Sequence, residues 1–340
     1  MDELMLAELC RRCALGEPLA PAEPVSGGLL HRMYRLQTTQ GRFAVKVLSP
    51  IVMQYADVRE NFRLSERIAR AIVAAGLPAI TALECVEDVL QDVGLVSVMV
   101  FPWVEAHALS SAGPLQTYQI GSILGRIHTL PLRFGEPPRP GPQDHSEDEA
   151  DGWAFLVEEA EQRQITWAGE VRPLLPQIAA WICSSEETRQ ALGDRWVISH
   201  GDLDRKNVLW SDENTPWLID WESAGHVQPA IEAVGAALDW SGQAAGALDA
   251  AAFQAFLTGY RREAPLTARE VGYGLHAYCG NWCGWLKFSM QRSLGLVTSD
   301  PEEQALGIRE TFGTLALLRS AALDIPDLSR AYSCETVTRR

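Results

Sequence analysis

Between Val197 and Trp210 the sequence reads V-I-S-H-G-D-L-D-R-K-N-V-L-W, which places polar and charged side chains between two apolar segments. Asp202 and Asn207 are separated by four residues, and a second carboxylate, Asp220, follows after twelve more. Hard oxygen ligands of this kind suit Mg²⁺, which commonly takes one or two carboxylates together with substrate phosphates. A further carboxylate can accept the proton of an attacking hydroxyl. The group therefore predicts phosphoryl transfer, a reaction in which the protein mainly positions the reactants and stabilises charge.

The apolar segments around these residues predict a hairpin. Residues 208–209 and 217–219 would pair across the turn D-E-N-T-P at 212–216. That pairing would bring Asp220 close to Asn207, so that these two side chains fit the role of magnesium ligands.

The other polar residues of this loop have separate expected roles. Asp202 fits the catalytic base. His200 is expected to form structural hydrogen bonds beneath the loop and not to act as a catalyst. Arg205 or Lys206 would either contact the γ-phosphate and stabilise its spreading charge, or be a solvated loop charge, and the sequence leaves both interpretations open.

Length and charge limit the classes of partner. The chain has 340 residues, which favours two domains or lobes, and 47% of them are hydrophobic, so a sizeable core can form. The formal net charge of −15 disfavours binding to nucleic acid or to an anionic membrane surface. It would instead attract cationic partners.

The beginning of the chain and its cysteines predict a cytoplasmic protein. The first residues, M-D-E-L, do not resemble a basic leader segment. The longest nearly apolar run, at 93–104, is too short to span a bilayer. The seven cysteines show no zinc-finger spacing and are expected to be reduced thiols.

The pattern of apolar residues divides the chain into two parts. The first hundred residues predict a small sheet and one long helix, with strands at 31–38, 42–48, 84–87 and 93–101 and a helix from Pro50 to Ala75. Ser49 and Pro50 are typical of a helix start. Pro102 ends the last strand, and the sequence after it is mainly helical.

The pattern His200-Gly201-Asp202-x₄-Asn207, followed by x₁₂ and Asp220-Trp221-Glu222, resembles the aminoglycoside phosphotransferase and choline kinase group. This group is the small-molecule branch of the protein-kinase-like fold. Protein kinases carry H-R-D-L-x-x-x-N and D-F-G instead. The resemblance implies an α+β, bilobal fold with an N-terminal nucleotide-binding lobe at 1–101, a mainly helical C-terminal catalytic and substrate-binding lobe at 102–340, and a hinge near 101–105.

The resemblance also implies a nucleotide site. Lys46, in F-A-V-K-V, matches the lysine that binds the phosphates of ATP, and Gly27-Gly28 matches a short phosphate-covering loop, although a full G-x-G-x-x-G is absent. The hinge residues Phe101 and Trp103 would meet the base. A glutamate on the long helix would orient Lys46, and the spacing favours Glu66 over Glu60.

The function implied by the resemblance is transfer of the γ-phosphate of ATP, with Mg²⁺, to a hydroxyl of a small molecule. GTP is an alternative donor, and the oligomeric state is left open. The acidic residues at 147–149, 151, 158, 159 and 161 would favour a cationic acceptor such as an aminoglycoside-type antibiotic. The alternatives are a metabolic kinase for choline, a sugar or an amino-acid alcohol, and a nucleotide-binding pseudokinase. A pseudokinase would have lost Lys46, Asp202 or Asn207, and all three are present.

Overall fold

The computed structural model describes residues 3–25, 31–55, 57–86, 88–136, 148–212 and 214–335. The chain forms two compact units. The first consists of Met1–Ser110, Leu130–Phe134 and Ile198–Gly225, and the second of Ser111–Thr129, Gly135–Val197 and His226–Arg340. The division at residue 101 drawn from the sequence stays a prediction. Within the described ranges, no helix combines the length and the apolar character needed to cross a membrane.

The first unit is built on a five-stranded antiparallel sheet in the order β1-β2-β3-β5-β4. Its strands are β1 (Glu23–Val25), β2 (Arg32–Thr38), β3 (Gly41–Val47), β4 (Gln91–Val93) and β5 (Val96–Pro102). The hairpin predicted between β2 and β3 is confirmed.

Two of the predicted strands need correction. The run 93–101 is not one strand, because Gly94, at φ +59°, turns the chain back and β4 pairs with β5. Leu95, at the tip of this turn, is fully exposed. In the segment 84–87, Cys85 forms only an isolated bridge with Asp88, and Glu87 lies outside the described residues.

The two faces of the sheet pack against different helices. Helix α1 (Glu3–Arg12) contributes Leu6 and Leu9 to a core with Val45 and Val100. On strand β3 successive side chains alternate between faces, so Lys46 points away from this core.

The opposite core contains Phe62, of helix α3 (Val58–Ala74), and Met99. Met99 is the register partner of Lys46 on β5. Lys46 is therefore placed on the face of the sheet that packs against α3.

The helix predicted over 50–75 is divided in the structure. Helix α2 (Pro50–Met53) begins as expected, with the Ser49 hydroxyl accepting a hydrogen bond from the Ile51 N–H and with Pro50 in the first turn. It ends after one turn, and α3 begins at Val58. The expected helix start is confirmed, but its continuity is not.

The segment Ile198–Gly225 completes the first unit. Strands β6 (His107–Ala108), β8 (Val208–Trp210) and β9 (Pro216–Leu218) form a three-stranded sheet, in which β8 and β9 make the predicted hairpin. Strand β7 (Val197–Ser199) leads into the loop, the 3₁₀ turns η2 (Arg205–Asn207) and η3 (Trp221–Ser223) flank the hairpin, and β10 (Gly225–Val227) follows. The Ile80 N–H donates to the Leu218 carbonyl, so the chain after α3 is tied to this hairpin.

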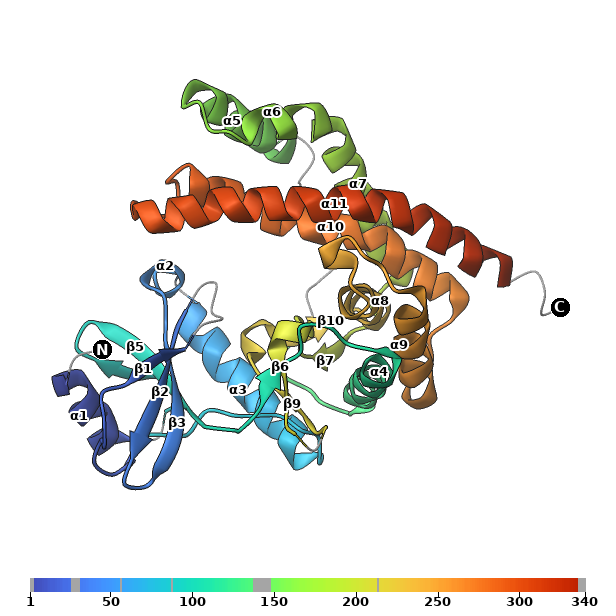
Figure 1. Cartoon of the computed structure of the whole chain (residues 1–340). Coiled ribbons are helices and arrows are strands. Elements are labelled where there is room, and N and C mark those ends of the chain that lie inside the picture. The colour runs from blue at the N-terminus through green and yellow to red at the C-terminus, as the bar shows by residue number, and fades with distance from the viewer. Residues whose placement is uncertain are drawn as a thin grey trace. The chain divides into compact units, whose positions relative to one another are not determined.

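The second unit is helical, as the sequence predicts. Its helices are α4 (Pro114–Thr129), α5 (Asp148–Gln162), α6 (Ala168–Val171), α7 (Leu175–Leu192), α8 (Pro229–Trp240), α9 (Ala250–Glu263), α10 (Ala268–Ser293) and α11 (Pro301–Glu335), with the 3₁₀ turns η1 (Arg172–Leu174) and η4 (Gln243–Ala245). Helices α10 and α11 run side by side (Figure 1). Helix α10 starts with a capping box between Thr267 and Glu270.

The structure corrects the expectation that the thiols are reduced. Cys13, just after α1, forms a disulfide with Cys85. The two residues are 72 positions apart in the sequence, so the bond closes a long loop within the first unit. Neither cysteine belongs to a recognisable motif, and the pairing follows from the packing of α1 beneath the sheet.

Candidate active site

Lys46 lies at the centre of a group of carboxylates. Its Nζ donates to Asp220 Oδ1 at 2.6 Å and to Glu222 Oε2 at 2.8 Å. Lys46 is only 7% exposed, which an ammonium group tolerates when it is paired. Burial opposes the charge of Lys46, but the two carboxylates outweigh it and raise the pKa of the lysine. The ammonium is therefore charged at neutral pH.

Glu222 is the main residue of this group that sequence analysis left without a role. Its Oε2 accepts from Lys46 and also contacts His31 Nε2 at 3.0 Å. Burial disfavours the charge of Glu222, but His31 and Lys46 together lower its pKa to about 2. The only available signal was its position two residues after Asp220.

His31, at the start of β2, was not predicted at all. Its Nδ1 accepts a hydrogen bond from the Ser49 N–H at 3.0 Å, so the ring proton of the neutral imidazole is on Nε2 and is donated to Glu222. The side chain is 6% exposed and packs edge-on against Phe62. His31 thus connects the beginning of β2 to the carboxylate that holds Lys46.

Glu66 is buried on α3 but makes a different contact from the one expected. Its Oε2 accepts from the Ala82 N–H at 2.7 Å, while Lys46 contacts Asp220 and Glu222. Burial raises the pKa of Glu66 to about 7. Glu60 is exposed and pairs with Arg63 and Arg67, so of the two candidate glutamates only Glu66 faces the interior.

His200 holds the loop after β7 to the hairpin, as predicted. Its Nε2 donates to the Ile219 carbonyl at 2.9 Å, and its Nδ1 accepts from the Asp202 N–H at 3.3 Å. It is completely buried. Both ring nitrogens are therefore used in positioning the backbone on either side of the site.

Gly201 is required by the path of the chain. Its φ is +80°, a region that residues with a Cβ rarely adopt. A Cβ at this position would also lie 2.2 Å from the Ser223 carbonyl oxygen. This close approach explains why the position that protein kinases fill with arginine is a glycine here.

Asn207 links Asp202 to the hairpin. Its side-chain Nδ2 donates to the backbone carbonyl of Asp202 at 2.8 Å and to Asp202 Oδ2 at 2.9 Å. The backbone carbonyl of Asn207 accepts from the Ile219 N–H at 3.0 Å. These contacts bring Asn207 next to the residue that precedes Asp220, as the hairpin predicted. Both side-chain hydrogen bonds are made by Nδ2, so Asn207 Oδ1, the atom suited to binding a cation, takes part in neither of them.

Asp220 has an unusual backbone. Its φ and ψ are both 62°, the left-handed region, which is uncommon for a residue with a side chain and concentrates at functional sites. Together with Asn207 Oδ1, its carboxylate supplies hard oxygen atoms of the type that Mg²⁺ prefers. The residues present therefore fit a magnesium ion.

The residues expected at the hinge have only some of their backbone groups available to bind a nucleotide base. The Trp103 N–H donates to the Arg42 carbonyl at 3.1 Å, and Phe101 is in register with Ala44 within the sheet. The Trp103 N–H is thus used by the sheet and not by a nucleotide base. Gly27 and Gly28 lie outside the described residues.

Six of the seven acidic residues expected to attract a cationic acceptor lie on α5, and Glu147 lies outside the described residues. Glu159 pairs with Arg163, and Glu161 pairs with Arg172. Two of these seven carboxylates are therefore paired within the second unit, which weakens the argument for a cationic acceptor.

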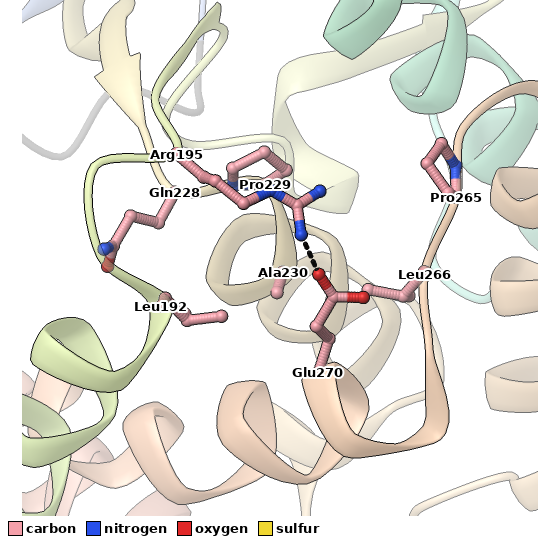
Figure 2. Close-up of a pocket in the computed structure, with 8 residues that line it drawn as sticks. All are labelled: Leu192, Arg195, Gln228, Pro229, Ala230, Pro265, Leu266 and Glu270. Atoms are coloured by element: carbon pink, nitrogen blue, oxygen red, sulfur yellow. Dashed lines mark hydrogen bonds and ion pairs between the residues drawn. The ribbon is translucent and has the colours of Figure 1, made fainter.

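A small pocket lies in the second unit, between the end of α7 and the starts of α8 and α10 (Figure 2). An ion pair between Arg195 and Glu270 crosses it, and Glu270 also caps α10 (Figure 2). None of the predicted site residues lines it. We assign this pocket no catalytic role.

The chain matches a protein-family model, and it is similar to proteins described as small-molecule kinases. Residues 21–266 match the model of the phosphotransferase enzyme family. A homoserine kinase of Neisseria meningitidis serogroup B (strain ATCC BAA-335 / MC58) is 24% identical over 266 residues, which are 76% of this chain and 79% of that protein.

Solved structures with the same fold cover nearly the whole chain. A spectinomycin phosphotransferase in complex with ADP and spectinomycin matches with a TM-score of 0.68 and 14% identity, over 95% of this chain and 99% of that chain. A choline kinase from Streptococcus pneumoniae matches with a TM-score of 0.61 and 18% identity, over 92% and 99%. The predicted α+β, protein-kinase-like fold and the resemblance to the aminoglycoside phosphotransferase and choline kinase group are confirmed. The chain, with its match over 21–266, belongs to the phosphotransferase enzyme family.

Proposed function

We propose that this protein is an ATP- and Mg²⁺-dependent O-phosphotransferase that phosphorylates a hydroxyl of a small, amine-bearing molecule. The observation that carries the proposal is the linkage through Asn207. This one side chain holds the carboxylate of Asp202, and its backbone is bonded to the residue before Asp220. This linkage supports a proposed base and a proposed hard-oxygen donor set on one loop and hairpin, where Asp220 contacts Lys46.

Each of these residues would have a separate role in phosphoryl transfer. Lys46 would bind phosphate oxygens of the nucleotide, because it is a buried cation whose charge is secured by two carboxylates. Asn207 and Asp220 would hold Mg²⁺, which when bound neutralises phosphate charge. Asp202 would accept a hydrogen bond from the acceptor hydroxyl and take its proton as the new bond to phosphorus forms.

The donor nucleotide is proposed to be ATP, with GTP as the alternative. The related spectinomycin phosphotransferase is described with ADP, the product that ATP would leave. Since the Trp103 N–H is bonded to Arg42, this segment has one fewer backbone donor with which to distinguish the two bases.

The substrates named for related proteins share chemical groups that suggest the class of acceptor. The relatives are named for spectinomycin, choline and homoserine. All three molecules combine a hydroxyl with an amine or ammonium group, and a protein of net charge −15 attracts such cations. An aminoglycoside-type antibiotic is the first candidate, in which case the enzyme would confer resistance.

A metabolic acceptor is the second candidate. The curated relative with detectable sequence similarity over most of both chains is a homoserine kinase. This match favours an amino-acid alcohol over the other metabolic alternatives.

The test is ADP release with Mg²⁺ and ATP over a panel of aminoglycosides, spectinomycin, choline, ethanolamine, homoserine and simple sugars. We expect one amine-bearing alcohol to stimulate release. The Asp202→Asn variant should lose roughly 10²–10⁴-fold in kcat while it keeps its affinity for ATP.

The matched control is Asp212→Asn, which makes the same chemical change at an exposed position on the turn of the same hairpin. It should retain full turnover. An Asp202→Asn variant as active as the wild type would exclude Asp202 as the base, and ATP binding without any stimulated release would favour the nucleotide-binding pseudokinase.

A further inference from the structure

Lys206 places a second cation beside the proposed catalytic base. Its Nζ lies 3.4 Å from Asp202 Oδ2 and 3.0 Å from Asp204 Oδ2. The side chain is 49% exposed, in contrast to the 9% of the Lys46 side chain. Its charge is thus close to the reacting position and remains accessible to a ligand.

The loop is built to hold Lys206 in this place. Asp204 caps the 3₁₀ turn η2, with its Oδ1 accepting from the Lys206 N–H at 2.7 Å. The same carboxylate contacts the ammonium through Oδ2. One aspartate therefore fixes both the backbone and the tip of the lysine.

The neighbouring cation is directed elsewhere. Arg205 Nη1 donates to the Ser110 carbonyl at 3.2 Å. Of the two residues that the sequence left as candidates for the γ-phosphate, only the Lys206 side chain contacts Asp202 within the described part of the chain.

The site needs a cation at this position. During transfer, negative charge spreads over the three non-bridging oxygens of the γ-phosphoryl group, and the acceptor hydroxyl that attacks it is held by Asp202. A carboxylate alone would repel that charge. Lys46 contacts Asp220 and Glu222, whereas the ammonium of Lys206 adjoins the Asp202 carboxylate itself.

We propose that Lys206 is a catalytic residue that binds the γ-phosphoryl group of the nucleotide while that group passes to the hydroxyl at Asp202. This inference rests on the proposed function. In the step, the bond between the acceptor oxygen and phosphorus forms and the bond to the β,γ-bridging oxygen breaks. ADP leaves with that electron pair, and the hydroxyl proton goes to Asp202. Lys206 transfers nothing in this step and serves only as a cation beside Asp202.

The experiment compares two nucleotides that differ by the γ-phosphate. The dissociation constants of ADP and of the non-hydrolysable analogue AMP-PNP are measured with Mg²⁺ by calorimetry for the wild type, Lys206→Met, Lys206→Arg and Arg205→Gln. Lys206→Met should weaken AMP-PNP roughly tenfold or more and leave ADP within about twofold, because one charge-assisted contact to the γ-phosphate is lost.

The other variants separate a ligand contact from a structural one. Lys206→Arg should keep most of the preference for AMP-PNP, since it keeps the charge. Arg205→Gln, the control on the same turn, should change neither constant. With an acceptor present, Lys206→Met should also lower kcat by about 10²-fold, the effect of removing one stabiliser of transition-state charge.

The experiment distinguishes a failure of the proposed role of Lys206 from a failure of the proposed phosphotransferase function. Equal weakening of ADP and AMP-PNP, or no change in either, would show that Lys206 only braces the loop and would overturn the inference. A wild type that binds both nucleotides but phosphorylates no acceptor would count against the proposed function, while the ratio of the two constants still decides the role of Lys206. A wild type that binds neither nucleotide would overturn both.

Discussion

The Nζ of Lys46 lies 2.6 Å from Oδ1 of Asp220, although the two residues are 174 positions apart in the sequence. The proposed phosphate-binding cation and a proposed metal ligand are therefore paired with each other in the protein alone. When a nucleotide binds with Mg²⁺, this ion pair would have to separate. Lys46 would then contact the phosphates, and Asp220 would contact the metal ion. Glu222 then remains as the carboxylate that keeps Lys46 in place.

Replacement of Lys46 by methionine should abolish most nucleotide binding. The variant removes the buried cation and leaves Asp220 and Glu222 to repel both each other and the phosphates. We expect the dissociation constant of Mg²⁺–ATP to rise at least roughly tenfold in calorimetry. The matched control is Arg42→Gln on the same strand, an exposed cation paired with Glu105, which should bind ATP normally. Normal binding by Lys46→Met would remove Lys46 from the site.

Replacement of His31 should act on the nucleotide and not on the acceptor. His31→Ala deletes the donor that holds Glu222, so Lys46 loses a fixed partner. The KM for ATP should rise about tenfold, as for the loss of a hydrogen bond to a charged group, while the KM for the acceptor stays the same.

The variant His31→Gln distinguishes positioning from packing. Glutamine can donate to Glu222 and accept from the Ser49 N–H, so it should restore most of the ATP affinity. If alanine and glutamine raise the KM for ATP equally, or if both raise the KM for the acceptor, His31 does not act through Glu222.

Glu66 should make stability depend on pH. Burial raises the pKa of its carboxyl from 4.5 to about 7, so the folded protein binds this proton more tightly than the unfolded chain. The stabilisation is fully present below pH 4.5 and is lost as the pH rises through 7, and it amounts to about 3 kcal/mol.

The test compares wild type with Glu66→Gln in urea denaturation between pH 4.5 and 8. Glutamine does not titrate and can still accept from the Ala82 N–H. The free energy of unfolding of the wild type should therefore fall relative to the variant as the pH rises. Glu60→Gln, on the exposed side of α3, should run parallel to the wild type. Parallel curves for Glu66→Gln as well would contradict the raised pKa.

The disulfide between Cys13 and Cys85 should contribute to stability only under oxidising conditions. Closing a loop between residues 72 positions apart should add about 4 kcal/mol by restricting the unfolded chain. Reductant should lower the free energy of unfolding of the wild type to that of Cys13→Ser and leave the variant unchanged. The control Cys183→Ser changes an exposed free thiol and should behave as the wild type. A wild type that is insensitive to reductant, with all seven thiols titrating after unfolding without it, would show that the bond does not form.

The sequence was sufficient where spacing along the chain decides geometry. Asp202, Asn207 and Asp220 lie on one loop and one hairpin, so the residue count between them nearly determines their proximity, and the β8–β9 pairing confirms the hairpin. The position of Lys46 on a strand was likewise readable from the alternation of apolar residues. The α+β class followed from the family resemblance that these motifs carry.

Local patterns misled where two short elements adjoin. The apolar run 93–101 looks like one buried strand, but Gly94 adopts a positive φ and divides it into a pair. The helical pattern over 50–75 likewise hides the break between α2 and α3. The periodicity of apolar residues shows which positions are buried. It does not show a tight turn when the segments on both sides of the turn are buried.

The sequence by itself determined which groups are proposed for phosphoryl transfer on the loop and hairpin, because Asp202, Asn207 and Asp220 follow one another at fixed spacing. Only the tertiary structure decided how those groups are partnered. Glu222, held by His31, pairs with Lys46, while Glu66 is withdrawn to the Ala82 N–H. Such pairings join segments far apart in the chain, and they depend on which face of the sheet α3 covers and on the left-handed turn at Asp220, which no count of residues specifies.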